Sequence, residues 1–536
     1  MNRTQRFTLA ATGLGLFMIF LDALIVNVAL PSIQGDFHVG ESGLQWVVTA
    51  YSLGMAVAIM SAGTLADIQG RRRIYLAGIV LFTAASIACG LARSLDFLNA
   101  ARAVQGVAAA TVNVTSLALV SAAFADPKQK AWAIGIWTAI ASTALAIGPT
   151  LGGVLVQRAG WRIIFLVNAP VGLAVIALTL RFVGESRDER PRRLDVPGQL
   201  LFVVMVGAFA YAVIEGPRAG WRSPEIVGLF AIALAALAGF VRVERRSPDP
   251  MMDLTLFRDR TYSLAIVTIF TVLFAVYGML LVITQYLQNV RGFSPTDAGL
   301  LLLPYSSTCT LMALLAGRLM GIVGARRLIL SGLASQMIAL SILMTGVGHA
   351  TPIVVAGLVF SALGSSLCLT PITSLAMTAV PPERAGMASG IMSAQRALGS
   401  TVGFAVLGSV LAASLTATLS AHLAQALPDA LERREVADTI IGNANPRAYA
   451  AEIGPGRAII HMNSATQRAI LDAADGDFVE GIRWSLASAL VLLVLVFAAG
   501  IAWFPRRRSG IADAAREAGR LEREEESRAS PEGALS

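Results

Sequence analysis

An acidic residue stands inside an otherwise apolar stretch near the start of the chain. Asp22 lies in GLFMIFLDALIVNVALP, part of an apolar run long enough to cross a membrane. A carboxylate at membrane depth is costly unless it faces a water-filled cavity or a partner, and a carboxyl group in a low-dielectric site holds a proton more readily than one in water. Asp22 is therefore our candidate for binding and releasing a proton or a cation; a structural hydrogen bond between helices is the alternative.

A basic residue at similar depth offers this carboxylate a partner. Arg102 lies in RAVQGVAAA, near the outer end of the fourth apolar run, and this run crosses the membrane in the opposite direction to the first. Both charges would then occupy the outer half of the membrane. We predict that Asp22 and Arg102 form a proton-coupling pair; the alternative is an arginine whose head group reaches the outer surface.

The fifth apolar run contains residues that break helix regularity. Gly148, Pro149, Gly152 and Gly153 lie together in AIGPTLGGVL. Proline removes a backbone hydrogen bond and kinks a helix, and glycines let another helix approach closely. These residues predict a moving interface, or hinge, between helices; a static kink is the alternative.

Further polar and aromatic residues lie within or at the ends of apolar runs. Each alone is more often a packing residue, but together they could line the apolar pocket with a few oriented polar groups that is usual for a small-molecule site. Arg396 in addition needs a partner or a watered cavity, because it lies near the middle of its run. The candidates for a substrate cavity are Asn27, Trp46, Tyr51, Gln285, Gln395 and Arg396.

The elements that must position these residues are membrane-spanning helices. Charged residues make up only 14% of the chain, whereas they make up about 25% of a soluble protein. A spanning helix needs about 20 mainly apolar residues, and fourteen such runs predict an all-α integral membrane protein with 14 transmembrane helices. The runs are 7–30, 44–66, 74–92, 97–122, 131–156, 161–183, 196–214, 224–241, 262–287, 297–320, 326–346, 351–378, 384–413 and 482–504.

A repeated segment divides these helices into two halves. GTLADIQGRRR (63–73) ends the second run and GRLMGIVGARR (317–327) ends the tenth, both on the same side of the membrane. A same-side repeat indicates parallel halves related by a pseudo-twofold axis along the membrane normal; chance similarity is the alternative. We predict two six-helix bundles, 7–183 and 261–504, with two extra helices inserted in the linker 184–260.

Arginine and lysine are concentrated in alternate loops. Cytoplasmic loops of membrane proteins collect these residues, so the pattern predicts that both termini, residues 1–6 and the tail 505–536, are cytoplasmic. Residues 414–480 would then form a long outer loop of one or two short helices and irregular structure. The same rule accounts for the net charge of +8 without a nucleic-acid partner.

The composition argues against other classes of chemistry. The four histidines all fall in loops, which predicts no intramembrane metal site. The chain has only two lysines, Lys128 and Lys130, and neither follows a glycine, as the lysine of a phosphate-binding loop would. The sequence also lacks the clustered histidines, cysteines or paired acids that a membrane enzyme would need. We expect no cofactor, no metal and no enzymatic activity.

The order of these motifs resembles the major facilitator superfamily, in particular its fourteen-helix drug:proton antiporters. LDALIVNVALP, GTLADIQGRRRIYL, RAVQGVAAA and AIGPTLGGVL are similar to motifs of that branch, as are WRIIFLVNAPVG, YLQNVRGFSPTDAGL and PPERAGMASGIMSAQRALGS. The resemblance covers about residues 5–505. The sequence as a whole most resembles actinobacterial spectinomycin and tetracycline efflux pumps.

The resemblance implies roles for individual residues. Asp22 and Arg102 would couple transport to protons, and the stretch from Gly148 to Gly153 would be the rocking hinge of an exporter. A cytoplasmic latch that gates the transporter would be formed by Gly63, Asp67, Gly70, Arg71 and Arg72.

The chain departs from the pattern of this family at three places. Leu24 stands where the first motif usually has threonine. Ile68 stands where the loop motif usually has arginine, so the latch would rely more on Arg71 and Arg72. The tenth run has no acid deeper than Asp297. Some members of the family carry an acid in the middle of this helix that favours divalent cationic drugs, so the resemblance does not imply that preference here.

Together these features predict a proton-coupled exporter of antibiotics or other amphipathic drugs, working by alternating access in the inner, or plasma, membrane. Its expected partners are a small-molecule drug, protons and membrane lipid. The oligomeric state is left open, with a monomer expected. The alternatives are export of a native metabolite, lipid or siderophore, and a transporter-like receptor that does not transport.

Overall fold

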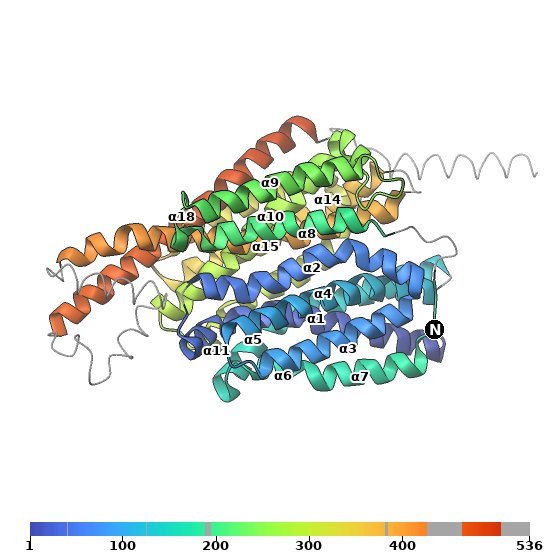
Figure 1. The fold of residues 1–536 in the computed structure, drawn as a ribbon, viewed down its shortest axis with the longest axis horizontal. Helices are drawn as coiled ribbons and strands as arrows, with labels where there is room; N and C mark the ends of the chain where they lie inside the picture. The colour runs from blue at the N-terminus through green and yellow to red at the C-terminus, as the bar shows by residue number, and fades with distance from the viewer. Residues whose placement is uncertain (40, 125, 188–193, 381–383, 426–463, 505–536) are drawn as a thin grey trace, which may run out of the picture.

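The computed structural model describes residues 1–39, 41–124, 126–187, 194–380, 384–425 and 464–504. In this part of the chain every regular element is a helix, and most helices lie along the long axis of the molecule (Figure 1). Short 3-10 or π-helical turns occupy Leu254–Arg258 (η1), Tyr286–Val290 (η2) and Leu423–Gln425 (η4). The α-helices are α1 (Arg3–Phe37), α2 (Glu41–Gln69), α3 (Arg71–Gly90), α4 (Leu95–Ala123), α5 (Pro127–Ala159), α6 (Ile163–Leu166), α7 (Asn168–Phe182), α8 (Val196–Ala219), α9 (Pro224–Glu244), α10 (Arg260–Gln285), α11 (Pro295–Leu301), α12 (Leu303–Val323), α13 (Ala325–Gly346), α14 (Thr351–Thr378), α15 (Ala385–His422) and α18 (Ser464–Trp503).

Twelve stretches of helix in the described residues are long and apolar enough to cross a membrane. They correspond to twelve of the predicted runs, so the all-α, multi-pass membrane fold is confirmed. The other two runs, 131–156 and 297–320, fall on α5 and on α11 with α12, which are helical but are not among the twelve. The count of fourteen spans therefore stays a prediction.

Polar side chains mark where several helices begin. Asn2 and Gln5 form a reciprocal cap at the start of α1, in which each side chain accepts a hydrogen bond from the backbone of the other. Ser94, Asp195 and Asp259 accept from free backbone N–H groups at the starts of α4, α8 and α10. Such caps satisfy donors that have no partner within the helix.

The buried apolar side chains form separate clusters. The largest contains fully buried residues from α8 onward, whereas two others come mainly from α1–α7. Leu281 of α10 and Phe404 of α15 join one of the latter clusters and link the two sets of helices. We refer to α1–α7 as the N-terminal helices and to α10–α18 as the C-terminal helices; their division into two six-helix bundles stays a prediction.

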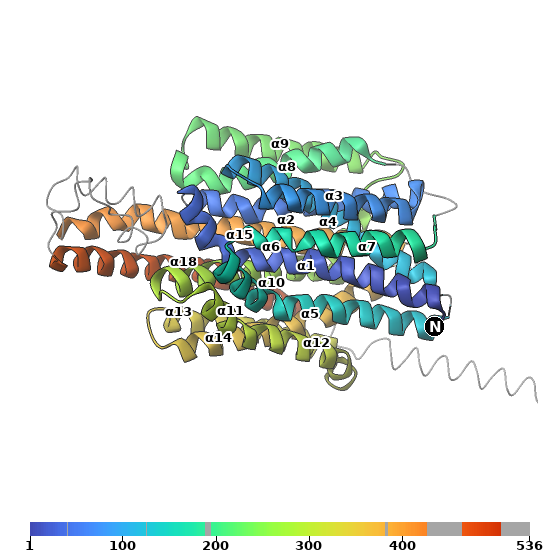
Figure 2. The same cartoon turned by 90° about the horizontal axis from the view of Figure 1, so that it is seen from below.

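The helices α8 and α9 pack against each other as a hairpin at the edge of the molecule (Figure 2). Near the start of α8, Gln199 Nε2 donates to the carbonyl oxygen of Val57 on α2 at 2.5 Å, and the Ser61 hydroxyl donates to Gln199. Near its end, Trp46 Nε1 on α2 donates to Glu215 at 3.1 Å. Hydrogen bonds therefore attach α8 to α2 at both ends.

The predicted outer loop 414–480 begins and ends as helix. The helices α15 and α18 continue into it and extend beyond the neighbouring helices (Figure 1). Both carry buried apolar residues at helical spacing, which gives them a face to pack together. On α15 and the η4 turn that follows it they are Leu411, Leu415, Leu419 and Leu423, and on α18 they are Ile470, Ala474 and Phe478. The centre of the predicted loop, part of the linker and the tail 505–536 lie outside the described residues.

Candidate functional site

The structure brings Asp22 and Arg102 into direct contact. Arg102 Nη1 lies 2.5 Å from Asp22 Oδ2, and both side chains are completely buried. Asp22 is on α1 and Arg102 is on α4, and the opposite directions of these helices bring the two charges to the same depth. A buried pair of this kind is stable only when the remaining polar atoms also find partners.

Three further buried side chains join this network, in which Arg102 Nη2 has no hydrogen-bond partner among the described residues. Gln105 Nε2 and Asn168 Nδ2 each donate to Asp22 Oδ1 at 2.9 Å. Both amides also donate to the Ser86 hydroxyl, at 2.7 and 3.3 Å. Each carboxylate oxygen of Asp22 thus accepts at least one hydrogen bond, which stabilises the charged form.

Asn168 and Ser86 were not predicted from the sequence. Asn168 lies in WRIIFLVNAPVG, and Ser86 in an apolar run of α3. The available signal was a single polar residue within an apolar stretch, which does not show which neighbour it faces.

A tyrosine separates this network from a large cavity. The Arg102 guanidinium carbon lies 4.3 Å from the centre of the Tyr51 ring, close enough for a cation–π interaction. Arg102 Nε also donates to the carbonyl oxygen of Val47 at 3.1 Å, and the Tyr51 hydroxyl donates to that of Ile19 at 3.0 Å. Tyr51 lines the cavity, whereas Asp22 and Arg102 are not among the described lining residues.

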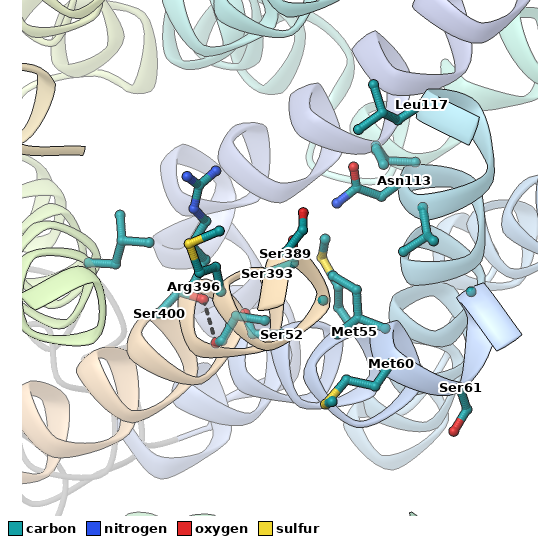
Figure 3. Close-up of a pocket in the computed structure, with 18 of the residues that line it drawn as sticks. Ser52, Met55, Met60, Ser61, Asn113, Leu117, Ser389, Ser393, Arg396 and Ser400 are labelled. Atoms are coloured by element: carbon teal, nitrogen blue, oxygen red, sulfur yellow. Dashed lines mark hydrogen bonds between the residues drawn. The ribbon is translucent and has the colours of Figure 1, made fainter. Parts of the chain in front are cut away.

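The cavity has a volume of about 830 Å³ and lies between the N-terminal and C-terminal helices. Its lining comes from α1, α2, α4 and α5 on one side and from α10, α14 and α15 on the other; Figure 3 shows some of these side chains. The lining extends to Asp67, Asp195 and Met251, at the end of the molecule where α1 begins. We call this the open end of the cavity.

At the opposite, closed end the two sets of helices are in contact. Thr150 Oγ1 on α5 donates to the carbonyl oxygen of Gly299 on α11 at 3.2 Å. Gln288 Nε2 donates to the carbonyl oxygen of Val28 on α1 at 3.1 Å. Access in this structure is therefore from the open end.

Two of the six predicted cavity residues line this cavity. Tyr51 contributes from α2 and Arg396 from α15. Arg396 Nη2 is 2.7 Å from the Thr373 hydroxyl, which is also part of the lining.

The other four are not among the described lining residues. Asn27 donates to the carbonyl oxygen of Leu24 in its own helix at 3.3 Å, and Trp46 bonds to Glu215 as described above. Gln285 is fully buried near the end of α10. Gln395 is half-buried on α15, next to Arg396.

The predicted gating residues lie at the open end. Gly63 and Asp67 line the cavity, and Asp67 forms an ion pair at 2.9 Å with Arg71, four residues later. Gly70 joins α2 to α3 with a φ of 110°, a conformation that favours glycine. Arg72 Nη2 donates to the carbonyl oxygen of Leu180 at 2.7 Å.

An acid that was not predicted caps the helix at this turn. The Glu185 carboxylate accepts from the backbone N–H groups of Arg72 at 3.0 Å and Arg73 at 3.3 Å, at the start of α3. A Cβ atom on Gly70 would lie 2.8 Å from this carboxylate. The cap comes from the segment after α7, so sequence spacing around the turn gave no sign of it.

The predicted hinge lies where α5 crosses both α1 and α11. A Cβ on Gly152 would be 2.6 Å from Ile25 Cγ1 of α1, whereas one on Gly148 would be 3.4 Å from Leu24 Cβ, an ordinary contact. A Cβ on Gly153 would overlap the backbone of Pro295 on α11.

A second glycine completes the crossing. Gly299 on α11 approaches the carbonyl oxygen of Pro149 so closely that it leaves no room for a Cβ. It was not predicted, because only the packed structure shows which helix faces α5.

Among the described residues, no group of three or more histidine, cysteine, aspartate or glutamate side chains could hold a metal ion.

The chain is 60% identical over 506 residues to the multidrug resistance protein Stp of Mycobacterium tuberculosis, covering 94% of this chain and 93% of that protein. It is 45% identical to the drug efflux pump JefA of the same organism, covering 94% and 99% of the two chains. The tetracenomycin C resistance and export protein of Streptomyces glaucescens is 33% identical over 75% of each chain.

A solved structure has the same fold. The bacterial homolog of the human lysosomal transporter Spinster, in an inward-facing and unoccupied conformation, matches with a TM-score of 0.64 at 18% identity, over 94% of this chain and all of that one. The sequence model of the Major Facilitator Superfamily matches residues 12–404. The chain is therefore a multi-pass membrane transporter, not an enzyme, and belongs to the Major Facilitator Superfamily.

Proposed function

We propose that this protein exports amphipathic drugs from the cell in exchange for protons. Relatives that match nearly the whole chain are named as a multidrug resistance protein and a drug efflux pump, which supports drugs as the substrate class. The cavity of about 830 Å³ is large enough, since drug-sized ligands occupy pockets of roughly 300–1,000 Å³.

The observation that carries proton coupling is the buried Asp22–Arg102 pair behind Tyr51. Protonation of Asp22 removes its negative charge and weakens its hydrogen bonds from Arg102, Gln105 and Asn168. The freed guanidinium stays against the Tyr51 ring, which forms part of the cavity wall. A proton on Asp22 is thereby linked to the shape of the drug site.

Alternating access would follow from movement between the two sets of helices. In this structure the cavity is open at one end, while contacts between α5 and α11 close the other. We propose that the glycine-rich crossing on α5 acts as the hinge and that the segment from Gly63 to Arg72 acts as the latch when the open end closes. Drug and proton would each favour one of the two arrangements.

The topology belongs to the same proposal. The helices α5 and α12 have 33 and 21 residues, long enough to cross a bilayer, and with them the chain would have fourteen spans. The arginine-rich loops favour a plasma-membrane protein of two six-helix bundles with both termini, and hence the open end, in the cytoplasm. Protons, drug and lipid are then its partners.

The test is to separate drug binding from proton-driven movement with Asp22→Asn. Inverted membrane vesicles with an imposed pH gradient should accumulate rhodamine 123 or sulforhodamine B when they contain the wild-type protein. The variant should bind dye but lose gradient-driven accumulation, because the asparagine side chain has no carboxyl group to bind and release a proton. Accumulation by the variant at the wild-type rate would refute the assignment of Asp22.

Asp36→Asn on the same helix is the matched control. Asp36 pairs with Arg162 at 2.5 Å, but both side chains are more than two-fifths exposed. An exposed pair adds little, about 0–1 kcal/mol, to stability. This control should accumulate dye normally, so a loss specific to Asp22 would report the buried carboxylate.

A further inference from the structure

Arg396 carries a positive charge at depth in the cavity. It lies eleven positions after Ala385, the first residue of α15, which places it about 16 Å along that helix from the open end. Its side chain is exposed although the neighbouring Ala394 and Ala397 are buried, because it faces the cavity. Figure 3 shows the guanidinium extending away from the ribbon of α15.

No carboxylate in the described residues forms a salt bridge with this guanidinium. The two acids that line the cavity are otherwise engaged, since Asp67 pairs with Arg71 and Asp195 caps the start of α8. Asp22 is held by Arg102 behind Tyr51. The polar contact of Arg396 is with the Thr373 hydroxyl at 2.7 Å, a neutral group.

Hydroxyl groups lie beside this charge on the same face of α15. Ser389, Ser393 and Ser400 line the cavity at spacings of three to four residues around Arg396, so they follow one face of the helix. Ser400 donates to the carbonyl oxygen of Ala397 at 2.8 Å. Ser389 and Ser393 face the cavity as additional donors.

The rest of the lining suits a large apolar body. The rings of Tyr277 and Phe404 lie near the closed end, with centres 5.5 Å apart. Methionines such as Met55, Met60 and Met392 also line the space, and their flexible, polarisable side chains adapt to ligands of different shapes.

We propose that the cavity selects amphipathic organic anions, and that Arg396 binds their anionic group. A carboxylate, sulfonate or enolate placed there would accept charge-assisted hydrogen bonds from the guanidinium and further ones from Ser389 or Ser393. The apolar body would lie against the aromatic and methionine side chains. The inference rests on the proposed transport function and assigns the charge of its substrate.

Two dyes with the same xanthene skeleton and different charge test this selection. Sulforhodamine B carries sulfonate groups and a net negative charge, and rhodamine 123 is a cation. Fluorescence polarisation with the purified protein in detergent measures binding without any proton gradient. The wild-type protein should bind sulforhodamine B about tenfold more tightly than rhodamine 123, a difference of about 1.4 kcal/mol.

Substitutions at Arg396 separate charge from structure. Arg396→Gln should weaken binding of sulforhodamine B about tenfold. It should not weaken binding of rhodamine 123, because loss of the positive charge removes a repulsion from this cation. Arg396→Lys should retain most of the preference. Arg318→Gln is the matched control, because Arg318 is exposed on α12 and is not among the described lining residues.

Three results would overturn the proposal: a wild-type preference for rhodamine 123, no binding of either dye, or an equal loss of both dyes in Arg396→Gln. The transport function is judged separately in vesicles. If the dyes bind with the expected selectivity but neither accumulates under a pH gradient, proton-driven export fails and the role of Arg396 stands.

Discussion

At the scale of single residues, the central feature is a carboxylate that is buried but fully hydrogen-bonded. Asp22 accepts from Arg102 through one oxygen and from Gln105 and Asn168 through the other. Burying an unpaired charge would cost several kcal/mol, and these donors offset that cost. Protonation of the carboxylate weakens the hydrogen bonds from these donors, so the network can have two states.

Asn168→Ala should impair both stability and coupling. It removes a buried hydrogen bond to Asp22, and the loss of one partner of a buried polar group costs about 1–3 kcal/mol. We expect a lower melting temperature and slower gradient-driven dye accumulation in vesicles. Asn27→Ala is the control, since the described hydrogen bond of Asn27 stays within its own helix. Equal effects of both substitutions would show that Asn168 acts through packing alone.

Sequence reasoning found the charges of this site but not its amides. Asp22 and Arg102 could be paired because charged residues in apolar runs are rare and these two lie at one depth. Asn168 and Ser86 are ordinary polar residues, and their partners depend on the rotation of α7 and α3 about their axes. An apolar helix in a membrane shows only weak periodicity, so its sequence does not reveal that rotation.

At the scale of elements, the crossing of α5 with α11 closes one end of the cavity. Gly153 and Gly299 each face a backbone of the other helix at a distance that excludes a side chain. The kinking proline was recognisable in the sequence, and so was the need for small residues. The identity of the facing helix was not, because α11 is a short segment of seven residues after the turn that follows α10.

Gly153→Ala should shift the protein away from the arrangement seen here. The added methyl group meets the backbone of Pro295 and Thr296, which cannot rotate aside, so the closed end must separate. Spin labels at the exposed residues Leu180 and Ile322, on opposite sides of the open end, should then report a shorter distance.

Gly135→Ala provides the control for this change. Gly135 lies on the same helix, and a Cβ there meets nothing within 4 Å. It should leave the label distances unchanged. If Gly153→Ala also leaves them unchanged while the protein stays folded, the crossing does not control access.

At the scale of the whole molecule, the apolar runs predicted most of the helices, since length and hydropathy alone determine where a chain can cross a bilayer. The continuation of α15 and α18 beyond 413 and before 482 was missed. Hydropathy falls there, and the leucines of α15 recur only once per turn. One leucine per turn is typical of a helix that packs against one other helix. A search for apolar runs of membrane length does not detect this spacing.

The α8–α9 hairpin should move as one body with the N-terminal helices. Among the described residues three hydrogen bonds join α8 to α2, two at Gln199 and one at Glu215. One joins α8 to the C-terminal helices, from the Ser409 hydroxyl on α15 to the carbonyl oxygen of Val213 at 2.6 Å. The greater number of bonds to α2 supports this expectation, although apolar residues of α8 also pack into the C-terminal cluster.

Spin labels at Leu234 on α9 and Leu180 on α7 should keep a constant distance when pH or dye concentration changes, whereas the distance from Leu234 to Ile338 on α13 should vary. All three side chains are exposed. The opposite pattern would assign the hairpin to the C-terminal helices.

The hairpin also bears on how such a chain can change over evolution. Because α8 and α9 run in opposite directions, the start of α8 and the end of α9 lie at the same end of the molecule. Inserting or deleting the pair as a unit preserves the sidedness of every later segment, whereas gain or loss of a single helix would invert the whole second half. An ancestor could therefore acquire this hairpin in one genetic event, with its transport pathway still facing the correct compartment.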